Sequence, residues 1–171
     1  MVDGTRERRV ESDARYEVKL LGLTAYRYRH HASERWAGEC LAALDARTDD
    51  NGAVTQVHAR TVDGAFEVAI TTPSKPAPPV SASACTMSFA YWNPALSTQQ
   101  KLLDPGTGLL QDVQIMRIEP ASITVHGRNI TATGLRIVGL PHPIDLWYEG
   151  DEWIGLDTTV RGNRRLTYRL P

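Results

Sequence analysis

The sequence predicts a mainly β protein, either an antiparallel barrel or a strongly curved half-barrel of about ten strands with one short helix. Three observations predict this class. Turn residues recur at short intervals, apolar and polar residues alternate between them, and only one segment carries helix-start and helix-stop residues. The 171 residues, 42% hydrophobic and 23% charged, are typical of one folded domain, which we expect to cover 1–171.

The longest alternating stretch lies near the N-terminus and predicts a long strand. One face of this strand carries Tyr26, Tyr28, His30, Ala32, Glu34 and Trp36. The other face carries Arg27, Arg29, His31, Ser33 and Arg35. Because so long a strand must bend, we expect a curved sheet or a bulge near Gly38.

Turn residues divide the following chain into hairpins. Asn51-Gly52 separates 40–48 from 53–61, and this pair tolerates positive φ at both central positions of a type I′ turn. Asp63-Gly64 introduces a third strand over 65–71, which completes a meander. Further turns at 127–128, 150–151 and 162–163 predict hairpins in the C-terminal half.

One crossing and one helix interrupt this pattern. Four prolines fall within 72–83, so this segment is expected to be an irregular crossing inside the domain. Asn93 is a good N-cap and Pro94 suits the first helical position. These residues predict a helix over 94–103 that stops at Asp104-Pro105-Gly106.

Composition and missing motifs exclude several classes of function. Lys and Arg number 19 against 20 Asp and Glu, which disfavours nucleic acid as a partner. The chain has no apolar run long enough for a transmembrane segment, and it has no nucleophile-elbow or phosphate-loop motif. His30 and His31 are adjacent and face opposite sides of a strand, so we expect no metal site, and no cofactor is predicted.

The two cysteines leave two alternatives open. Cys40 and Cys85 allow a single disulfide, which would require an oxidising compartment. Two buried free thiols, acting as small hydrophobic residues, are equally compatible with their positions.

The aromatic residues predict a binding function. We expect a small hydrophobic molecule, an amphipathic molecule or a lipid to lie in an aromatic-lined interior, with the short helix as a lid. The residues predicted to line it are Tyr26, Tyr28, His30, Trp36, Trp92 and Trp147. The simpler alternative is that these rings only fill the core.

Two other functions stay open. The first is an acid/base enzyme in which His30 works with a carboxylate from Glu34, Asp45 or Asp145, although no motif supports it and the balance is against an enzyme. The second is a protein-interaction module that uses an exposed edge strand or the face of Arg27, Arg29 and Arg35, with a homo-oligomer as one outcome.

The chain resembles an exported bacterial family catalogued as domain of unknown function 6134, over about residue 9 to the C-terminus. The motifs that carry the resemblance are Tyr26-Arg27-Tyr28-Arg29-His30, Glu34-Arg35-Trp36, Cys85-Thr86-Met87, Tyr91-Trp92-Asn93-Pro94, Leu102-Leu103-Asp104-Pro105 and Asp145-Leu146-Trp147-Tyr148.

The resemblance implies no activity, but it does imply export. A periplasmic or secreted location and a Cys40 to Cys85 bridge are therefore expected. It also implies a signal and an additional strand ahead of this sequence. The run 3–10 would then be the second strand of a hairpin, with an unpaired edge that another chain could occupy.

Overall fold

The computed structural model describes residues 7–20, 23–74, 78–160 and 163–171. Within these ranges the chain forms thirteen β-strands and one short 3-10 helix, so the prediction of a mainly β protein is confirmed. The chain divides into two compact units. Unit 1 contains Met1–Ser88 and Leu103–Leu110, and unit 2 contains Phe89–Leu102 and Gln111–Pro171. A single-domain organisation over 1–171 stays a prediction.

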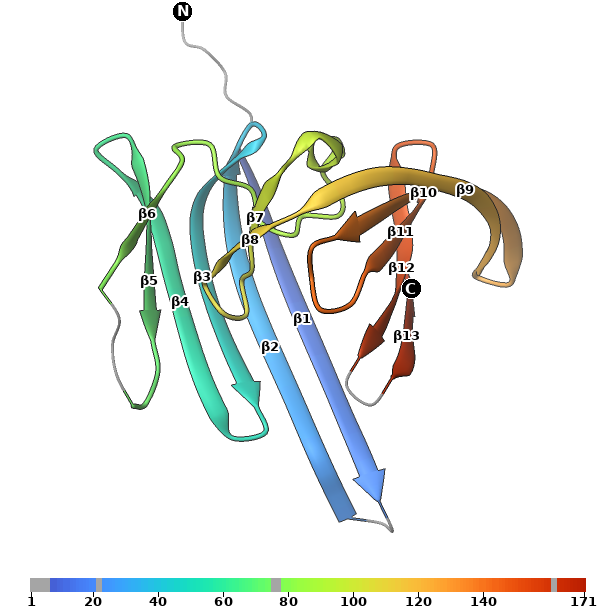
Figure 1. Ribbon diagram of the computed structural model, residues 1–171, viewed down its shortest axis with the longest axis horizontal. Coiled ribbons are helices and arrows are strands. Elements are labelled where there is room, and N and C mark those ends of the chain that lie inside the picture. The colour runs from blue at the N-terminus through green and yellow to red at the C-terminus, as the bar shows by residue number, and fades with distance from the viewer. Residues whose placement is uncertain (1–6, 21–22, 75–77, 161–162) are drawn as a thin grey trace, which may run out of the picture. The chain divides into compact units, whose positions relative to one another are not determined.

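Unit 1 is built on a six-stranded antiparallel sheet with the strands in sequence order (Figure 1). The strands are β1 (Glu7–Leu20), β2 (Leu23–Ala37), β3 (Cys40–Asp50), β4 (Ala53–Val62), β5 (Ala65–Thr71) and β6 (Val80–Ala82). β6 lies in the proline-rich crossing and pairs with β5. β3 pairs with β2 only as far as Tyr28, so the β1–β2 hairpin extends past the end of β3 (Figure 1).

The predicted turns connect these strands. Asn51 and Gly52 have φ values of 53° and 95°, as a type I′ turn requires, and Asp63 and Gly64 have 49° and 81°. The run 3–10 falls partly outside the described residues. From Glu7 onward it belongs to β1, which pairs with β2. The expected bulge appears as a register shift of β2 against β3 at Arg35/Trp36.

Alternating burial defines two faces of this sheet. On β2, the even-numbered residues from Tyr26 to Trp36 are buried or half-buried, whereas Arg29, His31 and Arg35 are exposed. We call the first side the inner face and the second the outer face. The fully buried side chains of the inner face include Trp36, Leu41, Leu44, Val57, Phe66 and Val68, so period-two patterning directs the hydrophobic core.

Two later segments of unit 1 cover part of this core. Leu41 N–H donates to the Thr86 carbonyl at 2.9 Å, and Leu103 N–H donates to the Met87 carbonyl at 2.8 Å. Farther on, the backbone at Gly108 lies so close to Val57 and Ile70 that a Cβ atom would clash with Ile70. The segment around 86–88 therefore lies against the start of β3, and the loop around 103–108 lies over β4 and β5.

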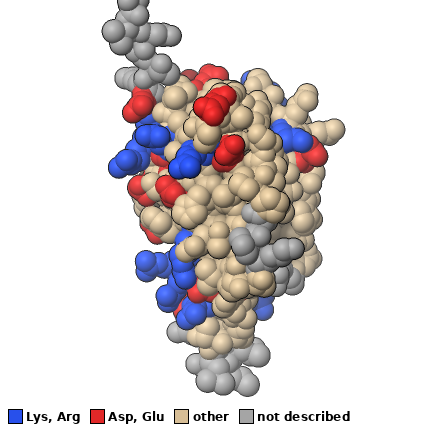
Figure 2. All heavy atoms as spheres, turned by 90° about the vertical axis from the view of Figure 1, so that its left-hand side faces the viewer, with Lys and Arg blue, Asp and Glu red and all other residues tan. Residues whose placement is uncertain are grey.

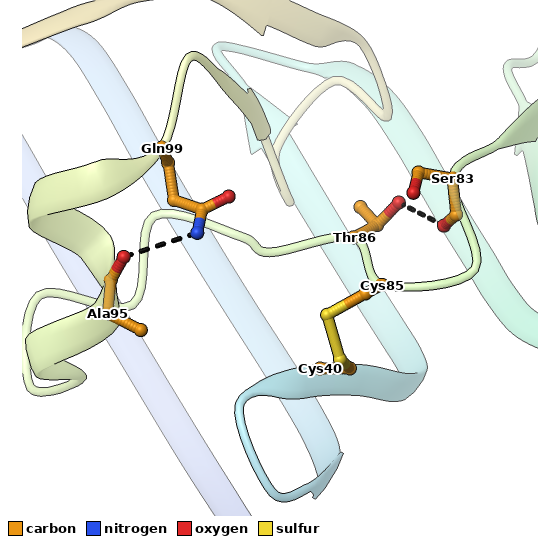
Figure 3. The surroundings of a disulfide bond; sticks show 6 residues. All are labelled: Cys40, Ser83, Cys85, Thr86, Ala95 and Gln99. Carbon is orange, nitrogen blue, oxygen red and sulfur yellow. Dashed lines mark hydrogen bonds between the residues drawn. A yellow bond between two sulfur atoms is a disulfide. The ribbon is translucent and has the colours of Figure 1, made fainter.

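Cys40 and Cys85 form a disulfide, with their Cα atoms 4.7 Å apart (Figure 3). The bond ties the start of β3 to the segment that follows the proline-rich crossing. The bridge expected from the family resemblance is therefore confirmed, and the alternative of two free thiols is wrong.

Unit 2 contains a five-stranded antiparallel sheet in the order β13-β12-β11-β10-β9 (Figure 1). Its strands are β9 (Gln114–Val125), β10 (Arg128–Val138), β11 (Ile144–Glu149), β12 (Glu152–Val160) and β13 (Arg164–Arg169). A core cluster of this unit consists of Ile123, Val125, Ile130, Ala132, Trp147 and Ile154. Gly134 leaves space for Trp147, because a Cβ atom there would lie 2.8 Å from the indole ring.

The predicted helix is shorter than expected. Asn93 is the N-cap, as predicted, and its side chain accepts a hydrogen bond from Ala95 N–H at 3.1 Å. The helix, η1 (Pro94–Thr98), is a 3-10 turn, and the predicted continuation to 103 is wrong. Lys101–Leu103 instead forms β7, which pairs with β8 (Leu110–Asp112). Strand pairing and burial of Leu102 and Leu103 override the helical pattern.

The barrel prediction is also wrong. The described strands form sheets of six, five and two strands, and none of these sheets closes on itself. Turn residues and alternation specify each strand and its neighbour along the chain. Closure requires the first and last strands of a sheet to pair, and no local pattern in this sequence encodes such a long-range pairing.

Candidate functional site

The inner face of β2 carries four of the six residues predicted to line a binding site. Tyr26, Tyr28, His30 and Trp36 all lie on this face. The two ends of the row differ, because Tyr26, Tyr28 and His30 are half-buried whereas Trp36 is completely buried. The row therefore has a closed end and an open end.

At the closed end, Trp36 Nε1–H donates to Glu34 Oε2 at 3.0 Å. Glu34 is itself buried, and burial raises the pKa of its carboxyl group. The Trp36 indole acts in the opposite direction, as does the Ser88 hydroxyl, which approaches the carboxylate without hydrogen-bond geometry. Trp36 and Glu34 thus form a buried polar pair inside the core.

A raised pKa favours the protonated Glu34 in the folded state. The protonated Glu34 carboxyl therefore contributes to the stability of the fold. This contribution is complete below the pKa of Glu34 in the unfolded chain and is lost as the pH rises through its higher pKa in the folded chain. We expect Glu34→Gln to raise the free energy of unfolding at pH 7 by about 1 kcal/mol, because the neutral amide removes a buried charge and still accepts from Trp36. The gain should vanish near pH 4 in denaturant titrations. Exposed Glu39→Gln is the control, and an equal gain there would refute this cause.

At the open end, the rings are joined by a hydroxyl from β3. His30 Nδ1 and Thr48 Oγ1 are 2.9 Å apart, and the Tyr28 and His30 rings stack with centroids 6.4 Å apart and an interplanar angle of 22°. A Cβ atom on Gly106 would lie 3.5 Å from Thr48 Oγ1 and 3.6 Å from the Tyr28 hydroxyl. The loop after β7 therefore borders this cluster.

Two further rings extend the open end along the hairpin. Tyr16 on β1 pairs directly with Tyr28, and its ring meets Tyr26 edge to face with centroids 6.2 Å apart. We call Tyr16, Tyr26, Tyr28 and His30 the tyrosine platform. Each of the four is half-buried, so the platform offers ring surface beside polar atoms.

Acidic side chains set the electrostatics of the platform. Burial raises the pKa of Tyr28, and the charges of Asp104 and Asp50 raise it further. Burial lowers the pKa of His30, against an opposing effect of Asp104. The lowered pKa favours the neutral form of His30, and Asp104 and Asp50 contribute negative charge near Tyr28.

Asp104 is held in place by its own loop. Its Oδ1 accepts from Gly106 N–H and its Oδ2 accepts from the Thr107 hydroxyl, both at 2.8 Å. The sequence pointed to neither Asp104 nor Thr48 as a site residue. Tyr16 could have been found, because it continues the alternation onto the preceding strand.

The carboxylates proposed to act with His30 have other partners. Glu34 accepts from Trp36 and lies four residues along β2 from His30, about 13 Å in an extended strand. Asp45 binds His58 Nδ1 at 2.6 Å, and Asp145 receives two hydrogen bonds from Arg136 in unit 2. In the structure His30 contacts Thr48 instead. The acid/base hypothesis stays a prediction, because these three carboxylates pair with other residues.

The remaining predicted aromatic residues, Trp92 and Trp147, belong to unit 2. Trp147 is buried in the core of that unit, and its Nε1–H donates to Asp157 Oδ2 at 2.8 Å. Trp92 is half-buried. Their role as ligand contacts stays a prediction.

Asp157 is the centre of a polar network in unit 2. It also accepts from the Thr167 hydroxyl at 2.7 Å and from Arg169 Nη2 at 3.0 Å. Burial raises the pKa of Asp157, but the hydrogen bonds from Thr167, Arg169 and Trp147 outweigh this effect and hold the pKa below its usual value. The network joins β11, β12 and β13, three adjacent strands of the sheet.

Unit 2 also contains an open groove of about 880 Å³. Its lining includes Ser97, Gln99, Lys101, Asp112, Gln114 and Val138. Many of its polar groups already have partners, because Lys101 pairs with Asp112 at 3.1 Å and Gln99 Nε2 donates to the Ala95 carbonyl at 3.2 Å (Figure 3). None of the six aromatic-site residues lines this groove.

The outer face of unit 1 is charged and largely exposed. Arg29 and Arg35 are exposed, whereas Arg27 is half-buried and lies 3.9 Å from Asp49. Figure 2 views the molecule from the side of β4 to β6, and charged side chains of both signs gather along the left margin of that view. The face predicted for protein interaction is therefore present as an exposed surface.

Across the described ranges, no three His, Cys, Asp or Glu side chains are grouped so that they could hold a metal ion. No helix in these ranges is both long and apolar enough to span a membrane. The protein is therefore a disulfide-bonded β protein that carries an aromatic platform on one of its antiparallel sheets.

The family follows from the sequence match. The chain belongs to the family described as domain of unknown function (DUF6134), whose model matches residues 2–170. No curated protein and no solved structure matches the chain.

Proposed function

We propose that the protein is a non-catalytic binding domain that holds an amphipathic small molecule on the tyrosine platform. The observation that carries the proposal is the half-buried stack of Tyr28 on His30, bordered by the Thr48 hydroxyl and the loop of Asp104. Ring faces bind the apolar part of a ligand, and a few polar groups fix its orientation.

The charges favour a cationic or hydrogen-bond-donating head group. Asp104 and Asp50 both act on Tyr28, and Asp104 also acts on His30. A positive head group near these carboxylates would also gain from contact with the faces of the tyrosine rings. An acyl or aryl tail would lie along Tyr16 and Tyr26.

The disulfide supports a location in an oxidising compartment outside the cytoplasm. Cys40–Cys85 requires an oxidising environment to form and persist. A periplasmic or secreted bacterial protein meets this requirement, and a ligand carried or sensed in the cell envelope fits both parts of the proposal.

Calorimetric titration with decyltrimethylammonium, below its micelle concentration, tests the platform. We expect saturable binding to the wild type, about tenfold weaker binding to Tyr28→Ala, and nearly unchanged binding to Tyr28→Phe, which keeps the ring. Tyr168→Ala, which removes an exposed ring of unit 2, should have no effect.

A second variant separates the charge from the rings. Asp104→Asn keeps the loop acceptor and should weaken decyltrimethylammonium binding, while binding of uncharged octyl glucoside stays the same. Equal affinities in wild type, Tyr28→Ala and Asp104→Asn would rule out the platform as the binding site.

A further inference from the structure

β1 is the terminal strand of the six-stranded sheet, and among the described residues it pairs only with β2. The direction of its free backbone groups can be derived. Asn51 N–H donates to the Arg27 carbonyl at 2.7 Å, so the backbone groups of Arg27 point toward the β3 side. Glu17 is opposite Arg27, and its own N–H and C=O therefore point away from β2.

The same geometry applies to every second residue of the strand. The backbone groups of Arg9, Glu11, Asp13 and Arg15 also point away from the sheet, and their side chains stand on the outer face with that of Glu17. β1 contains no proline. It therefore presents a continuous ladder of donors and acceptors that another extended strand can use.

The charges on this edge are arranged so that β1 is complementary to itself. In an antiparallel pair of β1 strands centred on Asp13, Arg9 is opposite Glu17 and Glu11 is opposite Arg15. A two-fold axis repeats each pair, so four opposite-charge pairs accompany one like pair, Asp13 with its copy. In the single chain the Asp13 carboxylate lies 3.1 Å from His31 Nδ1. Each His31 would therefore lie next to the pair of Asp13 carboxylates.

Neighbouring registers are less favourable. Centring the pair on Ser12 puts Arg9 opposite Arg15 and Glu11 opposite Asp13, so like charges meet throughout. Centring it on Glu11 restores opposite charges but aligns fewer residues, 7–15 of each strand instead of 7–19.

The inner face agrees with the register centred on Asp13. It places Val10 opposite Tyr16 and Ser12 opposite Ala14. Val10 and Tyr16 are half-buried, and Ser12 and Ala14 are exposed, in the single chain. Arg8 is opposite Val18 near the ends of the aligned stretch, whereas in the centre an aromatic residue meets a β-branched one, which stabilises antiparallel sheets.

We propose that a second copy of this chain adds to β1 as an antiparallel strand, with Asp13 on the two-fold axis. The two six-stranded sheets then continue into one twelve-stranded sheet, and the edge of each is covered. The interaction goes beyond the binding function of the platform and does not depend on it.

Sedimentation equilibrium of the full chain, with charge-reversal variants, tests the interface. We expect a wild-type dimer, and Arg9→Glu or Arg15→Glu should weaken it about tenfold or more, because each reversal creates two like pairs. Combining Arg9→Glu with Glu17→Arg should restore the dimer. Arg60→Glu makes the same charge change on the outer face of β4 and should leave the dimer intact.

Cross-linking fixes the register. Under mild oxidation, Asp13→Cys should give a disulfide-linked dimer in high yield, whereas Glu11→Cys and Ser12→Cys, which report the other two registers, should not, because those residues and their copies would lie too far apart for a disulfide. A wild type that stays monomeric, a dimer insensitive to both arginine reversals, or preferential cross-linking at position 11 or 12 would each overturn the proposal.

Discussion

Loss of the Cys40–Cys85 disulfide is expected to lower the free energy of unfolding of unit 1 by about 4 kcal/mol. The bond joins residues 45 positions apart, so without it the unfolded chain gains the entropy of a long open loop. The bond also holds the segment that contains Thr86 and Met87 against β3 and β7. Without it, this cover over the inner face should open more readily.

Denaturant unfolding of Cys40→Ser/Cys85→Ser measures this effect. Reducing the wild type should lower its midpoint to that of the double variant, and the same reductant should leave the variant unchanged. Equal midpoints for oxidised wild type and double variant would contradict the assigned role of the bond.

Asp157→Ala is expected to destabilise unit 2 by about 3 kcal/mol at pH 7. The substitution removes the acceptor for the buried Trp147 indole and for Thr167, and it leaves Arg169 without its carboxylate. The side-chain hydrogen bonds that connect β12 to β11 and β13 through Asp157 are then lost.

The pH dependence follows from the lowered pKa of Asp157. Its contribution is complete above the unfolded pKa of about 3.9 and is lost as the pH falls through the lower folded value. The difference between wild type and Asp157→Ala, measured by denaturant titration, should therefore shrink in strong acid.

Asp145→Ala is the matched control, because Asp145 also pairs with an arginine of unit 2, but this arginine is exposed and the carboxylate is only half-buried. It should cost about 1 kcal/mol or less. Similar losses for the two variants would show that burial of Asp157 does not set the size of its effect.

Local features of the fold were predictable from the sequence. Asn51-Gly52 and Asp63-Gly64 adopt positive φ and connect the strands expected on either side. The alternation from Tyr26 to Trp36 is reproduced by burial, because a pleated strand with one covered face requires it. These features depend on neighbouring residues only.

Features that depend on distant residues were not predictable. Asn93 caps a helix as expected, but pairing of Lys101–Leu103 with β8 ends it early. Trp36 is completely buried, and its strand partner Leu41 bonds to Thr86, which follows far along the chain, while Thr48 and Asp104 reach Tyr28 from other elements. Alternation shows which face a ring is on, but not what covers that face.

Aromatic-ring and nitrogen–proton NMR during a decyltrimethylammonium titration tests most directly whether the inner face of β2 is open at Tyr26 to His30 and closed at Trp36. The ring signals of Tyr26, Tyr28 and His30 should shift together and saturate, while the Trp36 indole N–H signal stays in place. Shifts at Trp36, or at Gln99 and Gln114 in the groove of unit 2 with the platform unchanged, would contradict this division.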